Sequence, residues 1–356
     1  MIAINMSFNT STKQILAQKS RYNRVLIGIL FLIFCVFVGI CFGTIHIPIK
    51  HTIGILTQSL TFLNLSNDWA NSHEVILLKI RFPRVILACI VGAALASSGA
   101  AFQGLFRNPL ADPYLIGVAG GAGLGAAITI LSKITLIVNL EFFLPIAAFT
   151  GAIITVTTAY FISIKSGKVS LISLILAGVA ISASTSAITA FLMIRSNPDL
   201  RPLVSWLLGG FQSAEWTQVL ILLVYLIPSW ILMMAYSRTL NTLQLDEKMA
   251  KQLGVNIEKT KVIIITTATL ATAAAVAFSG IIGFVGLIAP HCVRLIWNND
   301  YRSLIPTSAL LGASFMILAD LVSRTIIAPS ELPVGIITAL FGTPFFLYLL
   351  RKHNNS

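Results

Sequence analysis

The stretch Arg81-Phe-Pro-Arg-Val-Ile-Leu, followed across one apolar segment by Asn108-Pro-Leu-Ala-Asp-Pro-Tyr-Leu-Ile-Gly117, decides how this chain folds. It sets a polar, proline-broken turn directly between two hydrophobic segments. Lipid tolerates such a turn only where protein or water covers its backbone, because an unpaired N–H or C=O group is costly in hydrocarbon. The turn is therefore expected to lie against other protein or against water.

The composition agrees with a membrane protein. Of 356 residues, 56% are hydrophobic and 10% are charged, and the mean hydropathy is +0.90, far too apolar for a soluble domain. A helix needs about 20 apolar residues to cross a hydrocarbon core of ~30 Å. Ten segments qualify: 25–43, 84–104, 114–131, 142–164, 171–194, 219–237, 261–277, 280–296, 304–326 and 333–350. We predict an all-α polytopic membrane protein of about ten transmembrane helices.

Basic residues indicate the orientation. Most of the 24 Lys and Arg residues fall beside span ends that share a side with the N-terminus, and such residues are retained in the cytoplasm. Both termini are therefore expected to be cytoplasmic, with residues 1–24 as a tail and residues 25–351 as one transmembrane domain. The net charge of +12 then reflects this bias and attraction to the lipid membrane, and no nucleic-acid partner is expected.

Cysteine and histidine spacing does not indicate a metal site. The four cysteines form no CxxC pair, and the five histidines fall in separate segments without ligand spacing. We therefore expect neither a metal centre nor a cofactor.

The sequence lacks the usual features of a transporter that powers itself. The 12 acidic residues fall in loops or near span ends, whereas ion-driven transporters usually carry ionisable residues at mid-membrane. No GxxxxGK[ST] phosphate loop occurs. Uphill transport through this chain would need a partner that supplies the energy.

The long loop 239–260 is a candidate docking element for such a partner. Its acidic start suits the beginning of a helix, and Gly254 is placed to end it. Leu245, Met249 and Leu253 repeat at every fourth position and form an apolar stripe. An amphipathic segment lying on the membrane surface would show the same pattern.

Several motifs resemble one family. The turn Asn108 to Gly117 and the stretch Gly283-Phe-Val-Gly-Leu-Ile-Ala-Pro-His291-Cys-Val-Arg294 are similar to the signature of FecCD-type permeases, the membrane subunits of ABC importers for ferric siderophores, haem and vitamin B12. Further landmarks are Trp206-Leu-Leu-Gly-Gly210, Ala319-Asp320-Leu-Val-Ser-Arg324 and Glu331-Leu-Pro-Val-Gly335. The resemblance runs from Arg81 to Arg351 and implies the type II fold of ABC importer permeases.

The resemblance also implies function and partners. The chain would be a transport subunit and not an enzyme, moving a metal chelate into the cytoplasm across the bacterial inner membrane. A ferric siderophore is the expected cargo, with cobalamin or haem as alternatives. The expected partners are a second permease (homodimer or heterodimer), two ATPase subunits and an extracytoplasmic substrate-binding protein. The residues that resemble the ATPase-coupling segment are Glu247, Ala250, Leu253 and Gly254.

Two further sets of residues match family positions. Arg81, Arg84 and Arg324 resemble outward-facing arginines that dock on acids of the binding protein, although arginines at span ends also reach toward lipid headgroups. The proline-containing turns are expected to serve a structural, gating role without chemistry on the substrate. Their residues are Asn108, Pro109, Asp112, Pro113, Pro290, His291 and Arg294.

The translocation path is expected to have small, weakly polar walls, because a metal chelate is bulky. Two spans supply such residues: Ser97, Ser98 and Gln103 in one, and Ser182, Ser184, Thr185 and Ser186 in the other. Their hydroxyls could instead do no more than bond carbonyls of their own helix.

Two other classes compete with this interpretation. An intramembrane enzyme would need a catalytic constellation, and no HExxH, GxSxG or paired acids occur. A passive channel would not need a docking loop for an ATPase.

Overall fold

A computed structural model describes residues 2–61, 69–132, 140–196, 200–297 and 299–354. The first half contains α1 (Ile2–Cys41), α2 (Ile49–Thr61), α3 (Asn71–Val75), the π-helical turn η1 (Ile76–Arg81), α4 (Phe82–Phe106), the 3-10 turn η2 (Pro113–Ile116), α5 (Val118–Leu131), α6 (Leu140–Ser163) and α7 (Leu171–Arg195). The second half contains α8 (Arg201–Leu207), α9 (Trp216–Ala235), α10 (Ser237–Leu243), α11 (Glu247–Gln252), α12 (Ile257–Ser279), α13 (Val285–Ile296), α14 (Tyr301–Thr325) and α15 (Val334–Asn354). Strands β1 (Ile164–Lys165) and β2 (Lys168–Val169) pair in an antiparallel hairpin between α6 and α7.

The predicted all-α membrane fold is confirmed. Within the described residues, seven helices are long and apolar enough to cross a membrane. The shorter apolar helices α5 and α13 and the apolar part of α15, Val334–Tyr348, occupy the other three predicted spans. At 14 and 12 residues, α5 and α13 rise only about 20 Å. They are shorter than predicted because Gly117 (φ 103°) and Phe284 (φ 69°) have left-handed backbones, which an α-helix cannot contain.

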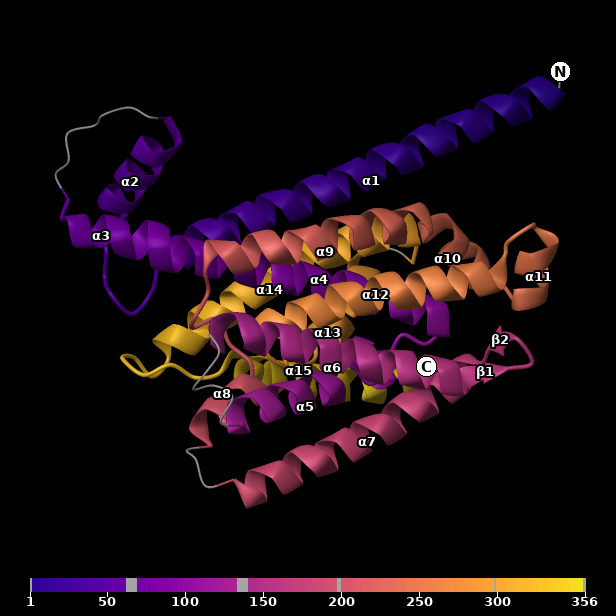
Figure 1. Ribbon diagram of the computed structural model, residues 1–356. Helices are drawn as coiled ribbons and strands as arrows, with labels where there is room; N and C mark the ends of the chain where they lie inside the picture. Colours follow the sequence, from indigo (N-terminus) through magenta and orange to yellow (C-terminus); the bar gives the residue numbers. More distant parts are fainter. Residues whose placement is uncertain (1, 62–68, 133–139, 197–199, 298, 355–356) are drawn as a thin grey trace.

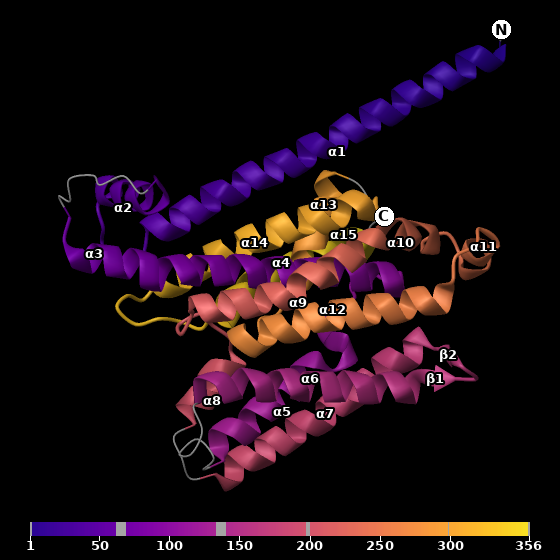
Figure 2. The same ribbon diagram turned by 45° about the horizontal axis from the view of Figure 1, so that its top comes forward.

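The helices form layers around α4, α12 and α14. Figure 1 and Figure 2 both place α1 and α7 at opposite edges of the bundle, with α4, α9 and α12 between them. We call the end that carries α10, α11 and the β1–β2 hairpin the hairpin end, and the opposite end, where α2 and α3 lie, the far end. Most residues of α4 and α12 are buried, whereas α1, α6, α7 and α9 keep exposed apolar faces.

Helix α1 diverges from the bundle toward its N-terminus, which lies clear of the other helices (Figure 1, Figure 2). Its 40 residues correspond to about 60 Å, at ~1.5 Å per residue, which is twice the thickness of the hydrocarbon core. Residues 2–24, predicted as a tail, thus continue the first span as helix. The cytoplasmic location of this segment stays a prediction.

Glycines allow the central helices to touch backbone to backbone. A Cβ atom on Gly92 of α4 would overlap the carbonyl oxygen of Gly312 of α14, and one on Gly99 would overlap that of Gly286 in α13. Gly121 of α5 meets Gly151 of α6 in the same way. Helices approach this closely only where small residues face each other.

We predict that Gly92→Val destabilises the protein, because the added carbons would force α4 away from α14. Overpacking of this kind costs about 1–3 kcal/mol in the free energy of unfolding. The measurement is thermal unfolding of the purified protein in detergent. Gly210→Val is the matched control, since a Cβ atom at Gly210 meets nothing within 4 Å; equal stability of the two variants would contradict the prediction.

Candidate functional site

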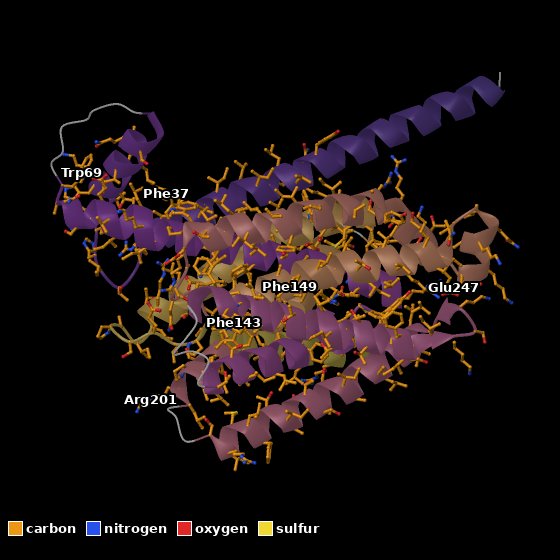
Figure 3. The ribbon with its side chains drawn as sticks, in the orientation of Figure 1. Phe37, Trp69, Phe143, Phe149, Arg201 and Glu247 are labelled. Atoms are coloured by element: carbon orange, nitrogen blue, oxygen red, sulfur yellow. The ribbon has the colours of Figure 1, made fainter. Side chains whose placement is uncertain are left out.

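The predicted coupling loop folds into the short helices α10 and α11 at the hairpin end. Glu247, labelled in Figure 3, begins α11 at the tip of the molecule. The helix ends near the predicted place: Gly254 has a φ of +82°, and its N–H donates to the Lys251 carbonyl at 3.0 Å. This left-handed glycine is the usual way to close a helix.

The apolar stripe of this segment faces away from the protein. Leu245, Met249 and Leu253 are 62%, 53% and 64% exposed, whereas Ala250 is fully buried. The small side chain of Ala250 packs inward and lets α11 lie close to the bundle, and its role in ATPase coupling stays a prediction. The exposed leucines and methionine remain available to a partner.

Lys261 connects this segment to the bundle, and the sequence analysis missed it. Its buried ammonium lies 3.0 Å from Glu258 Oε1 and 3.4 Å from Glu247 Oε1, and it donates to the Val169 carbonyl at 3.1 Å. Glu258 Oε2 also accepts from the Val169 N–H at 2.9 Å. A lysine beside a span end is ordinary, so only its spacing of three from Glu258 could have indicated a partner.

Helix α10 is fixed to two other helices. Gln244 Nε2 donates to the Gly104 carbonyl of α4 at 2.8 Å, and Asn241 Nδ2 donates to Asp300, the N-cap of α14, at 2.7 Å. Burial tends to raise the pKa of Asp300, but hydrogen bonds from Arg302 and Asn241 outweigh it and hold the pKa below its ordinary value. The hairpin end thus has rigid links to α4, α12 and α14.

The turn after α4 is held by its own polar side chains, as predicted. Asn108 Oδ1 accepts from the Leu110 N–H at 2.9 Å, and Asp112 Oδ1 accepts from the Tyr114 N–H at 2.8 Å. Burial raises the pKa of Asp112 to about 6, partly offset by that backbone hydrogen bond. The Tyr114 hydroxyl donates to the Ile282 carbonyl at 2.9 Å, which joins this turn to the segment before α13.

The second predicted turn is not a turn. Pro290, His291 and Arg294 lie inside α13, because the chain breaks earlier, at Phe284, and is helical from Val285 onward. Pro290 is buried within the helix. The two proline motifs still meet: Pro109 of the first lines a shallow hollow together with His291, while Pro113 is buried at the start of η2.

Three of the residues predicted to line the path, Ser97, Ser98 and Gln103, are buried on the central helix α4. A lining role for them stays a prediction. Ser97 Oγ bonds the Ala93 carbonyl of its own helix at 2.7 Å. Gln103 Nε2 donates to the Gly286 carbonyl at 3.1 Å.

Arg294 completes this contact between α4 and α13. Its guanidinium donates to Gln103 Oε1 and lies 6.0 Å from the centre of the Tyr301 ring. The polar residues Gln103 and Arg294 therefore join helices at the hairpin end and do not face a substrate.

The other predicted lining helix, α7, is exposed. Ser184 and Ser186 are exposed, Ser182 is half-buried, and Thr185 points inward and is buried. Helix α7 lies at the edge of the bundle (Figure 2). Its middle exposes the small or weakly polar residues Ala183, Ser184, Ser186 and Ala187. We call these residues the α7 face.

A buried ion-pair network occupies the far end. Arg84 Nη2 lies 2.9 Å from Asp320 Oδ1, and Arg84 Nη1 lies 3.0 Å from Glu331 Oε1. Arg324 Nε is 3.5 Å from Asp320 Oδ2, and Arg324 Nη2 donates to the Gly39 carbonyl of α1. The network joins α1, α4, α14 and the segment before α15.

Arg81 is held by backbone carbonyls. Its Nη1 donates to the carbonyls of Ile40 and Cys41, each at 3.3 Å, and its Nη2 donates to that of Ile45. Carbonyls at the end of α1 carry negative partial charge, so they partly compensate the guanidinium.

The three arginines predicted to form an outer basic patch are buried in this structure. Arg81, Arg84 and Arg324 are 4%, 7% and 3% exposed. Their side chains point inward, where nearby carboxylates and backbone carbonyls accept hydrogen bonds from the guanidinium groups. These groups therefore need no contact with water. A role of these arginines in docking stays a prediction, and their observed role is to hold helix ends together.

Ten apolar helical segments, with the short helices α10 and α11 at one end, make this an integral-membrane protein, and its relatives make it a permease subunit of an ABC importer. It belongs to the FecCD transport family, whose model matches residues 4–352.

Relatives within this family differ in cargo. The chain is 45% identical to the cobalamin import system permease protein BtuC of Halobacterium salinarum, over 78% of this chain and 74% of that protein. It is 40% identical to the hemin transport system permease protein HmuU of Yersinia pestis, over 84% and 90%. A solved metal-chelate type ABC transporter in an inward-facing conformation has a TM-score of 0.79 and 32% identity, over 92% of this chain and 98% of that one.

We predict that Asp320→Asn lowers stability strongly, since it leaves two buried guanidinium groups without their shared carboxylate. Breaking a buried pair in this way costs about 3–5 kcal/mol. Glu331→Gln is the control, because the Glu331 side chain is 25% exposed and that of Asp320 is 1% exposed. Thermal unfolding in detergent should rank Asp320→Asn well below Glu331→Gln, and the reverse order would show that the network does not hold the helices.

Proposed function

We propose that this permease carries a ferric siderophore, as an intact chelate, across a bacterial inner membrane into the cytoplasm. The likeness to a metal-chelate type transporter supports this cargo class. The observation that carries the proposal is the α7 face, where Ser184 and Ser186 stand among exposed alanines. Cobalamin or haem is the alternative, since the named relatives import these.

The path would form between two permeases. In this proposal a second permease, a copy of this chain or a homologue, packs on the large apolar side chains at the two ends of α7. Ile172, Leu176 and Ile194 are strongly exposed there, and contact with a second permease would replace lipid by close van der Waals packing. The two α7 faces would then enclose a wide path with hydroxyl-bearing walls.

The energy would come from two ATPase subunits that dock at the hairpin end, which is then cytoplasmic together with both termini. The exposed stripe of Leu245, Met249 and Leu253 is the proposed contact, because a row of apolar side chains fits a groove on a partner. Movement of α11 would reach α12 through Glu247 and Lys261.

An extracytoplasmic binding protein would deliver the chelate to the far end. The buried arginines would contribute by fixing the ends of α1, α4 and α14 as a rigid platform, and docking by the arginines themselves would require their side chains to leave the ion-pair network.

We predict that replacing Met249 and Leu253 together by Asp uncouples transport. Both side chains are exposed, so the permease should fold normally. Losing two buried apolar contacts of about 1.5 kcal/mol or more each should weaken ATPase binding by roughly 100-fold. Co-purification of the ATPase and stimulated ATP hydrolysis are the measurements.

Lys251→Asp is the matched control for this test. Lys251 is also exposed and lies about 200° around α11 from Met249, at ~100° per residue. It should retain ATPase binding. If Lys251→Asp weakens binding as much as the double variant does, added charge and not lost apolar contact is responsible, and the proposed contact is wrong.

We further predict that chelator and iron enter together. A wall of Ser and Ala residues cannot ligate a free metal ion, which requires several matched ligands. Vesicles containing the permease, its ATPase and its binding protein should therefore accumulate labelled siderophore and labelled iron in a 1:1 ratio, as one intact complex. Entry of iron without chelator would refute the mechanism. Uptake of only cobalamin or only haem would show that this compound, and not a siderophore, is the cargo.

A further inference from the structure

A cavity opens between α6 and α9 over α12, away from the α7 face. Its volume is about 610 Å³, within the range of ~300–1,000 Å³ that is usual for small-molecule sites. Figure 2 shows α12 between these two helices. The lining comes from the far-end half of each helix, as Phe149 of α6 does in Figure 3.

The body of the cavity is apolar. Phe149, Trp206, Tyr225 and Phe278 contribute aromatic walls, and the rings of Phe149 and Tyr225 pack with their centres 5.1 Å apart. The small residue Ala277 on α12 leaves the space that a larger side chain would fill. Such walls fit a hydrocarbon chain.

One end of the cavity carries an acidic side chain. Glu215, the N-cap residue of α9, is among the lining residues, and its side chain makes no capping hydrogen bond. No Lys or Arg is among the residues that line the cavity. The Glu215 carboxylate therefore favours a cationic ligand with N–H donors.

The dimensions of the cavity match half of a bilayer. Glu215 and Tyr225 are ten residues apart along α9, which corresponds to about 15 Å in a helix. This length is half of the ~30 Å hydrocarbon core. The polar end lies beside Trp216, the first residue of α9, and tryptophan is enriched where a span meets the headgroups. The polar end is thus at headgroup depth and the aromatic end is near the midplane.

We propose that this cavity binds a membrane phospholipid with a primary ammonium headgroup. The ammonium donates to the Glu215 carboxylate, and one acyl chain lies along α6 and α9 against the aromatic walls. A quaternary ammonium has no N–H to donate, and a headgroup with net negative charge is repelled by Glu215. The bound lipid belongs to the permease itself and is separate from the translocated cargo.

The test is native mass spectrometry of the purified full-length permease with lipids of identical acyl chains. Phosphatidylethanolamine should be retained at least about tenfold more than phosphatidylcholine or phosphatidylglycerol, a ratio equivalent to ~1.4 kcal/mol. Glu215→Gln should reduce this preference. Glu74→Gln, a change at another far-end acid that does not line the cavity, should leave it intact. Equal retention of the three lipids by the wild type would overturn the proposal.

Two matched variants test whether the lipid binds in the cavity or elsewhere on the surface of α6. Thr150 lines the cavity, and Thr158 does not; each is exposed, and each hydroxyl bonds a carbonyl of its own helix at 2.8 Å. Thr150→Trp should fill the space and abolish retention of phosphatidylethanolamine, whereas Thr158→Trp should retain it. If Thr150→Trp leaves lipid retention unchanged and instead alters the oligomeric state, the occupant is a second permease and the lipid proposal is wrong.

Discussion

The direct backbone contact of α4 with its neighbours is the constraint on which the rest of the structure depends. Gly92 and Gly99 let α14 and α13 approach without side chains between them. Helix α4 is consequently enclosed on most sides, and its polar residues must find partners inside the protein. This explains why Gln103 bonds the Gly286 carbonyl and Arg294, and why Arg84 bonds Asp320 and Glu331, rather than facing a path or a binding protein.

The sequence was sufficient to predict features that depend on neighbouring residues. Hydrophobic length predicted the ten segments, Asp112 was placed to cap a turn, and Gly254 was placed to end α11, because each depends on contacts a few residues apart. Arg84 shows where this reasoning stops. Its two acidic partners lie 236 and 247 residues away, and nothing local distinguishes an arginine that pairs inside the protein from one that faces water.

The same limit applies to the coupling segment and to α7. The spacing of Leu245, Met249 and Leu253 indicated one face of a helix, but not that Ala250 would be buried behind it. Four hydroxyl residues of α7 looked alike in sequence, yet Thr185 points inward while Ser184 and Ser186 are exposed. Which side of a helix faces its neighbours depends on tertiary packing, and a single apolar helix with little amphipathic pattern does not encode it locally.

Two ion pairs connect α11 to the bundle, and they respond differently to ionic strength. The Arg107–Asp246 pair has a separation of 4.0 Å and both side chains are at least one-third exposed, whereas the Lys261 ammonium is only 7% exposed beside Glu247. Mobile ions screen exposed charges over about 8 Å at physiological salt and affect buried charges much less. Salt would therefore loosen the link to α4 and preserve the link to α12, so we expect α12 to follow α11 when the segment moves.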